Sequence, residues 1–457
     1  MSGTTTVTPG AAPSAASDFA AASEYTALQR TVIIVSCMLG FALDLYDVLI
    51  MPFLMPAIQR GLGLTLTEVA SVTSFTLVGS VIGSVVFGWI GDRLGRRAAL
   101  QLALGLFACG SIASAFAWNY PELAGLRLLT GVGLGGEWGA GMVLFNEVWN
   151  PKSRGLGSAF IQGSAVVASA SASIVGIWVV RAFPPDIGWR VGYLTGGMPI
   201  LLMIAIRFMM PESRAWLRFD AERKTGALPP AQTGRNPLLG IFAPGLRRIT
   251  IVALFWLAAY MFAYYAVIVF IPTLMLRSLA TPPGVVRSAA LAVSVAGGLG
   301  YIVMGALNDR FGRRIGALLP SLMWLVFLLG LAAWGDQRYA GSLVAWPLFW
   351  LYIAFGLGNT SLGVVGTWLA ELYPIAVRAT AVSTIYMAGR AVGSFAPVIV
   401  PEVAAATGGG LAHGMLVALP AAVLFLVLTC RLPETSGRRL GPRRLRRVTS
   451  DRARRRE

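Results

Sequence analysis

The chain has 457 residues, of which 56% are hydrophobic and only 12% charged, and its mean hydropathy is +0.70. A water-soluble domain carries about 25% charged residues, so this composition excludes an ordinary soluble protein and indicates a chain that faces lipid. The formal net charge of +17 would suit nucleic acid, but the basic residues gather in short loops between apolar runs. We therefore expect no nucleic-acid partner.

Twelve apolar runs follow one another along the chain, each long enough to cross a bilayer, which takes about 20 residues in a helix. The predicted spans are residues 31–56, 67–90, 98–118, 121–148, 155–180, 190–210, 249–276, 286–307, 315–334, 342–370, 378–402 and 409–431. The sequence thus predicts an all-α integral membrane protein with twelve transmembrane helices. Cytoplasmic placement of both termini puts most of the 37 Lys and Arg residues inside, as the positive-inside rule requires.

The hydrophilic stretches divide the chain into five segments. Residues 1–30 lack the basic start and long apolar core of a signal peptide, and we expect a disordered cytoplasmic tail. A cytoplasmic linker at 211–248 separates one six-helix half, 31–210, from the other, 249–431. The arginine-rich tail 432–457 is expected to lie near anionic headgroups, with RNA binding as the alternative.

Three pairs of motifs recur at nearly one offset, which indicates an internal duplication. The pairs are 88–97 with 305–314 (Gly-x-x-x-Asp-Arg-x-Gly-Arg-Arg), 147–154 with 371–378, and 211–213 with 433–435. Two six-helix halves related by a pseudo-two-fold axis, with the site between them near the midplane, are typical of secondary transporters.

These paired loops, with Pro-Glu-Ser after the sixth span and Pro-Glu-Thr after the twelfth, resemble the major facilitator superfamily over residues 30–436. Segment 127–138 resembles that family's sugar-porter and metabolite:proton symporter branches. The resemblance implies that the loop charges lock the inner gate of the outward-open state, with simple anchoring at the headgroups as the alternative. The implied gate residues are Asp92, Arg93, Arg96, Arg97, Glu147, Arg154, Asp309, Arg310, Arg313, Glu371 and Arg378.

The first span carries two acids, Asp44 and Asp47, on one helix face near its middle. An ionised carboxylate there is costly unless it is paired or faces water. Two such groups facing one cavity would load and release a proton, although a structural cap or a permanently protonated acid is the alternative. Arg127 of the fourth span lies on the same side as Asp47 and could pair with it. Related porters use an acid in span one and an arginine in span four, so the resemblance implies that either aspartate couples protons with Arg127.

Two further charges lie within spans. Glu137, in the fourth span, has no partner in its own span, and it is either a second proton site or a group bonded to a neighbouring helix. Arg390 is the only charge at mid-membrane in the second half, which suits bidentate contact with a substrate carboxylate. The alternative for Arg390 is an ion pair with Glu137, Asp44 or Asp47.

Glycines at spacing four in the fourth span, Gly131 and Gly135, are expected to let helices pack closely. The three cysteines are isolated and His413 is the single histidine, so no metal, cofactor or enzymatic centre is expected.

The substrate is expected to be a small organic acid. Gln162 matches one glutamine that sugar porters use, but span seven offers aromatic residues and no glutamine. Among these, Trp256, Tyr260 and Tyr264 either line the cavity or merely pack. The Asp-Leu-Tyr-Asp arrangement of span one resembles symporters for muconate and aromatic acids. We therefore expect a monomeric, proton-coupled symporter of the inner (plasma) membrane working by alternating access. The alternatives are a sugar or other metabolite porter, a drug or metabolite:proton antiporter, and a transporter-like sensor.

Overall fold

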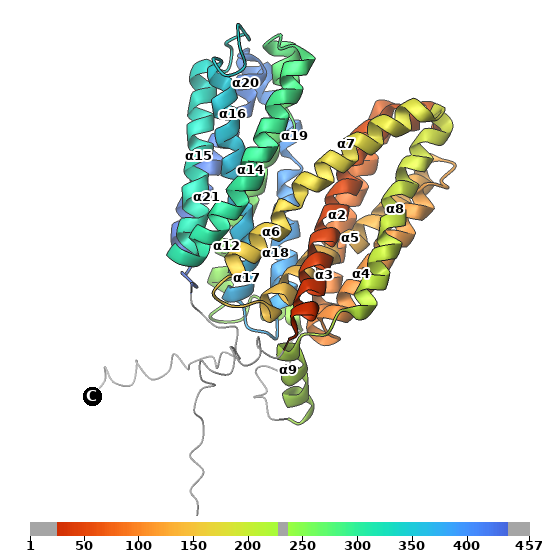
Figure 1. Ribbon diagram of the computed structural model, residues 1–457, viewed down its shortest axis with the longest axis vertical. Helices are drawn as coiled ribbons and strands as arrows, with labels where there is room; N and C mark the ends of the chain where they lie inside the picture. The colour runs from red at the N-terminus through yellow and green to blue at the C-terminus, as the bar shows by residue number, and fades with distance from the viewer. Residues whose placement is uncertain (1–24, 227–235, 437–457) are drawn as a thin grey trace, which may run out of the picture.

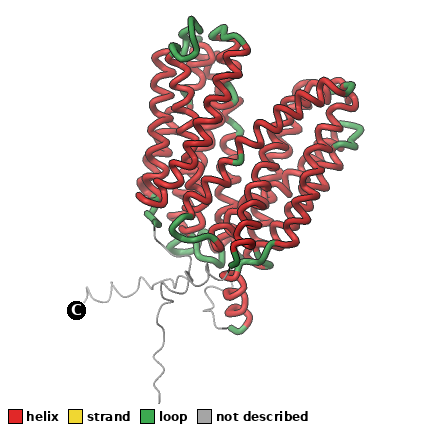
Figure 2. Tube along the Cα trace, in the orientation of Figure 1, coloured by secondary structure: helices red, strands yellow, loops and turns green. Residues whose placement is uncertain are grey.

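The computed structural model describes residues 25–226 and 236–436, and within these ranges every regular element is helical (Figure 2). The arginine-rich C-terminal stretch from residue 437 and most of the predicted N-terminal tail lie outside the described residues. The predicted all-α membrane fold is confirmed.

The first half contains six membrane-crossing helices, four of which start at a side-chain cap or a proline. They are α2 (Ala27–Leu62), α3 (Leu66–Arg93), α4 (Arg96–Ser114), α5 (Tyr120–Val148), α6 with α7 (Arg154–Gly163 and Ala165–Ala182) and α8 (Pro185–Met209). Thr26 and Thr65 each form a capping box with the residue three positions on, which satisfies two backbone donors that a helix start leaves free. Gly63, at φ 66°, ends α2.

The second half repeats the plan with more interruptions. Its helices are α12, α13 and η1 (Arg247–Ile268, Ile271–Thr273 and Leu274–Ser278), α14 (Pro283–Phe311), α15 (Arg313–Trp334), α16, η2 and α17 (Pro347–Gly358, Asn359–Ser361 and Leu362–Leu372), α18 and α19 (Arg378–Gly393 and Ala396–Thr407), and α20 and α21 (Gly410–Met415 and Ala418–Arg431). Two short helices, α9 (Arg214–Lys224) and α11 (Pro237–Gly240), lie between the halves in sequence.

The twelve crossings match the twelve predicted spans, with shifts of a few residues at their ends. Among the described residues, ten of these crossings are long and apolar enough to be recognised as membrane spans by length and composition alone. The other two are α8 and the α18–α19 crossing. Breaks within the fifth, seventh, tenth, eleventh and twelfth crossings were not predicted. A break depends on which neighbours satisfy the freed backbone groups, and this is a property of the packed bundle.

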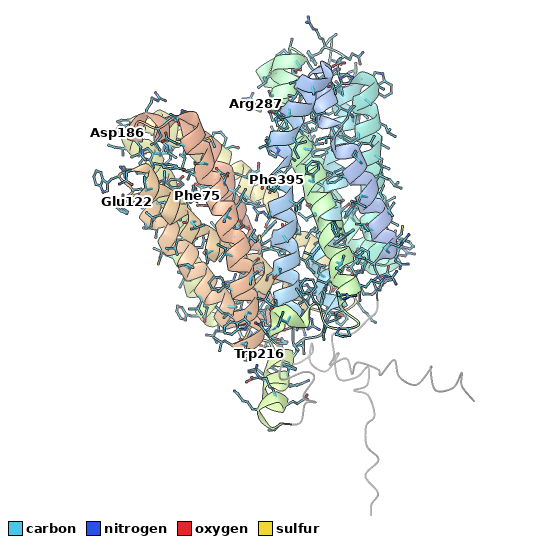
Figure 3. The ribbon with its side chains drawn as sticks, turned by 180° about the vertical axis from the view of Figure 1, so that it is seen from behind. Phe75, Glu122, Asp186, Trp216, Arg287 and Phe395 are labelled. Carbon is cyan, nitrogen blue, oxygen red and sulfur yellow. The ribbon has the colours of Figure 1, made fainter. Side chains whose placement is uncertain are left out.

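The two halves lean together at one end and diverge toward the other (Figure 1). We call the end that carries α9 the linker end, and the opposite one the far end. Contacts between the halves join α3 and α5 to α18, and α6 to α14 and α17. Figure 3 shows Trp216 at the linker end, Glu122 and Arg287 at the far ends of the two halves, and Phe75 and Phe395 on either side of the divide.

Glycines bring α3 and α5 into close contact, as predicted. A Cβ on Gly131 would lie 2.1 Å from the carbonyl oxygen of Thr76, and one on Gly135 would lie 1.9 Å from that of Ser80. No side chain fits at such distances, so these positions need glycine. Because α5 carries Arg127 as well, this packing fixes the height at which the arginine meets α2 and α3.

Candidate functional site

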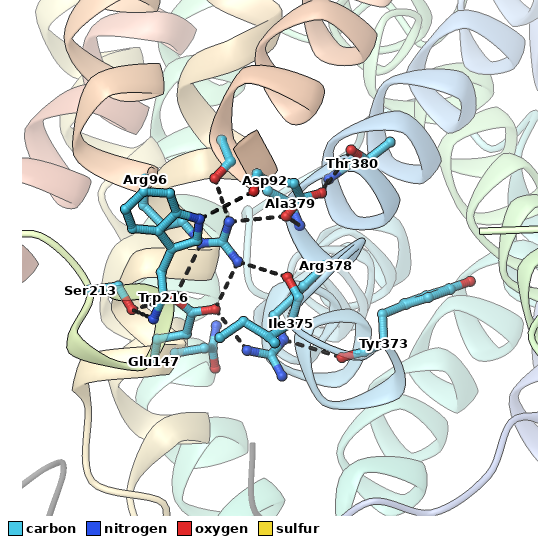
Figure 4. A network of polar contacts seen from close by, with 12 residues as sticks. Asp92, Arg96, Glu147, Ser213, Trp216, Tyr373, Ile375, Arg378, Ala379 and Thr380 are labelled. Atoms are coloured by element: carbon cyan, nitrogen blue, oxygen red, sulfur yellow. Dashed lines mark hydrogen bonds and ion pairs between the residues drawn. The ribbon is translucent and has the colours of Figure 1, made fainter. Parts of the chain in front are cut away.

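At the linker end, Arg96 joins the first half to the second (Figure 4). Its fully buried guanidinium donates to the Glu147 carboxylate at 3.1 and 3.3 Å and to Asp92 Oδ1 at 3.0 Å. It also donates to the carbonyl oxygen of Ile375, in the other half, at 3.1 Å. Gly95, at φ 107°, forms the turn before Arg96, and this backbone conformation suits glycine.

Asp92 binds the start of a helix in the second half. Its carboxylate accepts the backbone N–H groups of Ala379 and Thr380 at 3.1 and 2.9 Å, and the Thr380 hydroxyl at 2.8 Å. These groups form the first turn of α18, where a negative charge is favoured by the helix dipole. Beside them, Arg378 of α18 donates to Glu147 Oε1 of α5 at 2.7 Å. We call this cluster the first lock.

The second motif copy builds a matching cluster, the second lock. Asp309 of α14 accepts the backbone N–H groups of Gly155 and Leu156, at the start of α6 in the first half, at 2.7 and 2.8 Å. Arg313 donates to both oxygens of Glu371, at 2.7 and 3.0 Å, and to Asp309 at 3.1 Å. In the first lock an acid of the first half, Asp92, binds the start of α18 in the second half. In the second lock an acid of the second half, Asp309, binds the start of α6 in the first half.

Each lock is braced by the acid of the Pro-Glu-Ser or Pro-Glu-Thr motif. Glu212 accepts the backbone N–H of Arg96 at 3.0 Å, and Glu434 accepts that of Arg313 at 2.9 Å. Burial raises the pKa of Glu212 above its usual range despite these bonds. Burial also acts on the less buried Glu434, but there the backbone N–H groups of α15 and of the residues that follow prevail and lower its pKa. The two bracing acids therefore accept equivalent backbone hydrogen bonds, but the pKa is raised for Glu212 and lowered for Glu434.

The remaining predicted gate residues lie at the edge of the locks. Arg93 and Arg310 are exposed and stack on Trp89 and Phe311 at 5.4 and 5.3 Å from the ring centroids. Arg97 donates to the carbonyl of Phe208 at 2.9 Å, and Arg154 is buried in the first turn of α6. The side chains of Arg93, Arg97 and Arg310 contact groups of their own half, whereas the carbonyl oxygen of Arg154 accepts the Thr367 hydroxyl of the second half at 3.4 Å. The sequence grouped these residues with the locks without distinguishing their positions.

Deeper in the first half, Arg127 and Asp47 form the ion pair that the sequence allowed. The guanidinium donates to Asp47 Oδ1 at 3.0 Å and also to Oδ2, and its Nε donates to the Thr76 hydroxyl at 3.3 Å. Ser111 donates to Asp47 Oδ1 at 3.2 Å, and the Tyr193 ring lies 4.9 Å from the guanidinium carbon. Both oxygens of this buried carboxylate are thus satisfied in its ionised form.

Asp44 also forms an ion pair between the two halves. Arg390 of α18 approaches Asp44 Oδ2 at 3.5 Å, and both side chains are almost fully buried. Asp44 Oδ1 is buried without a hydrogen-bond partner, while Arg390 also interacts with Tyr265. The contact with Asp44 agrees with the alternative of an interhelix pair for Arg390, and it is longer and less complete than the pair at Asp47.

Glu137 has a partner that the sequence did not reveal. Arg207, near the end of α8, donates to its Oε1 at 3.0 Å. Arg207 was recognisable as a charge within a span, but nothing in the sequence tells which helices are adjacent. Three buried acids in the first half thus face three arginines, drawn from α5, α8 and α18.

Family models match the chain over most of its length. A model of the Major Facilitator Superfamily matches residues 33–277, and a model described as sugar (and other) transporter matches residues 231–441. The chain belongs to the major facilitator superfamily. It is a multi-pass membrane transporter and not an enzyme.

Two curated relatives and one solved structure illustrate the similarity. A probable 4-methylmuconolactone transporter of Cupriavidus pinatubonensis is 30% identical over 88% of this chain and 90% of its own length. The cis,cis-muconate transport protein of Acinetobacter baylyi is 24% identical over 83% of this chain and 88% of its own. The proton:xylose symporter bound to 6-bromo-6-deoxy-D-glucose superposes with a TM-score of 0.74 at 19% identity, covering 91% of this chain and 98% of that one. This last likeness supports the fold alone.

The polar and aromatic residues expected in the transporter's cavity divide into two groups. Gln162 accepts the Trp138 indole N–H at 3.1 Å and donates to the Leu362 carbonyl of the other half at 3.4 Å. Trp138 in turn stacks on Tyr386 of α18 with centroids 3.5 Å apart. These residues lie where the halves meet.

The aromatic residues of α12 lie mainly within the second half. Tyr260 donates to the carbonyl of Asn359, at the break in the tenth crossing, at 3.1 Å and stacks near Tyr264. Trp256 is fully buried, donates to Thr429 at 2.8 Å and packs on neighbouring rings of that half. Of the three predicted lining residues, Trp256 thus faces the core of the second half.

Proposed function

We propose that this transporter takes up small carboxylates together with protons. The observation that carries the proposal is the pair of Asp44 and Arg390 between the halves. A guanidinium presents two parallel donors that match a carboxylate, yet Arg390 meets Asp44 by one contact of 3.5 Å. A substrate carboxylate would make a better partner for Arg390 than Asp44 does.

Displacement of Asp44 from Arg390 would leave a buried carboxylate without a cation, which is strongly unfavourable. A proton on Asp44 removes that cost. The buried, unpartnered Oδ1 of Asp44 supports this step, because it is an oxygen on which a proton breaks no existing bond. Binding one carboxylate at Arg390 and one proton at Asp44 keeps the local charge constant, so the two ligands favour each other.

Asp47 and Arg127 extend this coupling toward the far end. Their pair has every carboxylate oxygen satisfied, so it holds α5 against α2 in this conformation. Protonation of Asp47 in another state would release Arg127 from α2. We therefore propose that Asp44, whose Oδ1 has no hydrogen-bond partner, takes the proton first in this conformation.

Alternating access follows from the locks. We propose that the linker end faces the cytoplasm, because the basic loops lie there, and that the structure is the outward-facing state. Both termini would then be cytoplasmic, the basic tail would lie near anionic headgroups, and a single chain would suffice. Opening the linker end requires breaking both locks, and rocking of one half against the other does this.

The substrate class is supported by relatives named for a muconolactone and for cis,cis-muconate. The amide of Gln162, the feature shared with sugar porters, is engaged by Trp138 and the Leu362 carbonyl, which disfavours a sugar. We propose that Arg390 holds the carboxylate and that Tyr264 and Tyr260 border the site, with Gln162 positioning Trp138. Trp256 is left out, because its indole is buried in the second half.

The test uses the purified full chain in liposomes that trap a pH-sensitive dye, under an inward acid gradient. Carboxylates (cis,cis-muconate and nicotinate), sugars (xylose) and organic cations are added in turn. We expect proton influx with carboxylates, its loss in Arg390→Ala and Asp44→Asn, and its retention in Arg287→Ala, an exposed arginine at the far end. Influx with sugars or cations alone, or full carboxylate influx in Arg390→Ala, overturns the proposal.

A further inference from the structure

The pair of Glu137 and Arg207 has no task in the cycle described so far. It lies inside the first half among α2, α5 and α8, and the two side chains are 3% and 1% exposed. Arg207 also donates to the carbonyl oxygen of Ser36 at 3.3 Å and contacts the Met210 sulfur at 3.4 Å. Arg207 is therefore held by partners other than Glu137, whereas Arg207 is the one charged group bonded to Glu137 among the contacts described.

Glu137 has an oxygen to spare. Its Oε1 accepts from Arg207, while its Oε2 is buried and has no hydrogen-bond partner. Glu137 also borders a small void whose other lining residues carry no formal charge: Cys37, Phe41, Trp138, Gly141, Met142 and Ile161. An ionised oxygen without a donor is disfavoured in such surroundings. A proton on Oε2 removes this penalty and leaves the bond from Arg207 to Oε1 possible.

The void lies close to the carboxylate site. Its residue Cys37 precedes Asp44 on α2 by about 10 Å, at 1.5 Å per residue. Because α2 starts at the linker end, Glu137 lies on the linker side of Asp44. Trp138, which lines the void, stacks on Tyr386 of α18, so the void's wall includes a contact between the halves.

We propose that Glu137 is a second proton-binding site of the transport cycle, so that two protons enter with each carboxylate. This rests on the proposed function of proton-coupled uptake. The proton forms an O–H bond at Glu137 Oε2 in the outward-facing state. It leaves to water at the linker end when rocking separates Trp138 from Tyr386. The groups facing Glu137 are Arg207 from α8 and Asp44 and the neutral Cys37 from α2. With a monocarboxylate, two protons make uptake electrogenic.

The experiment counts protons per carboxylate in liposomes containing the full chain. Dye-reported proton entry is divided by uptake of whichever labelled carboxylate, muconate or nicotinate, the chain accumulates. Wild type is expected at about two protons per carboxylate and Glu137→Gln at about one, with exchange of labelled for unlabelled carboxylate retained. For a monocarboxylate, an inside-negative potential of about 100 mV should raise wild-type accumulation about 50-fold, at tenfold per ~59 mV for one charge. Glu137→Gln should lose that dependence.

Two controls separate the possible failures. Glu122→Gln, an exposed helix-capping glutamate at the far end, is expected to behave as wild type. The double variant Glu137→Gln/Arg207→Met removes both charges and tests whether Glu137 merely neutralises Arg207. A ratio of about one in the double variant supports the proton site, and a return to about two overturns it. A wild-type ratio of one overturns this inference alone, whereas uptake independent of the acid gradient overturns the proposed function itself.

Discussion

The first lock is the most direct place to perturb this transporter, through Asp92→Asn. Asp92 is 2% exposed, and its carboxylate accepts three hydrogen bonds from Ala379 and Thr380 across the boundary between the halves. Asparagine has nearly the same shape and keeps one acceptor oxygen. The substitution therefore removes the charge and one set of bonds without creating a cavity.

The magnitude follows from those bonds. A hydrogen bond to a charged group contributes about 1.5–3 kcal/mol and a neutral one about 1 kcal/mol, and a negative charge at a helix N-terminus adds about 0.3–2 kcal/mol. Part of the loss is recovered by the amide oxygen, so we expect Asp92→Asn to weaken the closed linker end by about 2–3 kcal/mol. This corresponds to a shift of about 30- to 140-fold toward the state open at that end.

The assay follows the far end, which should close as the linker end opens. Phe395 lies beside the divide and is 63% exposed, so a Phe395→Cys reporter should react quickly with a membrane-impermeant maleimide. The background replaces the native Cys37, Cys109 and Cys430 by serine. Adding Asp92→Asn should slow labelling of the reporter, by up to the factor given above if the outward-facing state dominates in the wild type.

Two aspartates serve as controls. Asp309→Asn removes the matching charge of the second lock. Because Asp309 accepts two hydrogen bonds across the boundary where Asp92 accepts three, this substitution should slow labelling by a smaller factor. Asp220→Asn breaks a pair with Lys224 on α9, outside both locks, and should leave the rate unchanged. If Asp92→Asn labels at the rate of Asp220→Asn, the lock does not set the balance between the states and the reasoning is refuted.

Three further outcomes are expected. Gly135→Ala should lower thermal stability by about 1–3 kcal/mol or more, because its Cβ would lie 1.9 Å from the carbonyl oxygen of Ser80. The control is Gly125→Ala on the same helix, whose Cβ would meet nothing within 4 Å. It should be neutral or stabilising in the same melting assay. The lowered pKa of Glu434 means that its stabilising contribution is present above the unfolded-state pKa of about 4.3 and is lost as pH falls through the lower folded value; Glu434→Gln should flatten the acid limb of the stability profile, and an unchanged limb would contradict this. Arg127→Lys keeps the charge but loses the planar, paired donors of the guanidinium, so proton-driven uptake should fall while thermal stability changes little, and wild-type uptake would contradict the need for a bidentate pair.

The sequence could predict the fold because its signals are local. Apolar runs of membrane-spanning length and a motif repeated at nearly constant offset are visible without any partner. The helix breaks were not visible, since they depend on neighbours. At the tenth crossing, for example, the hydroxyls of Tyr260 and Tyr301 both donate to the carbonyl of Asn359, and these tyrosines come from two other crossings.

The candidate site was likewise predictable only in part. The positions of Asp47 and Arg127 along their spans were enough to suggest that they could meet, because both heights follow from residue number. The sequence did not identify the partners of Asp44, Glu137 and Glu147, because each partner depends on which helix lies alongside. Sequence alone left Arg390 between a ligand contact and an ion pair, and only the tertiary structure set it against Asp44.

By itself, the sequence determined that this protein spans a membrane, that it is duplicated, and which charges have to be compensated there, because the cost of a charge in lipid is independent of the fold. The tertiary structure decided how that compensation is made. It joined Arg378 of one half to Glu147 of the other, and Arg207 to Glu137. A charge states only that it needs a partner; the arrangement of twelve helices determines which partner is within reach.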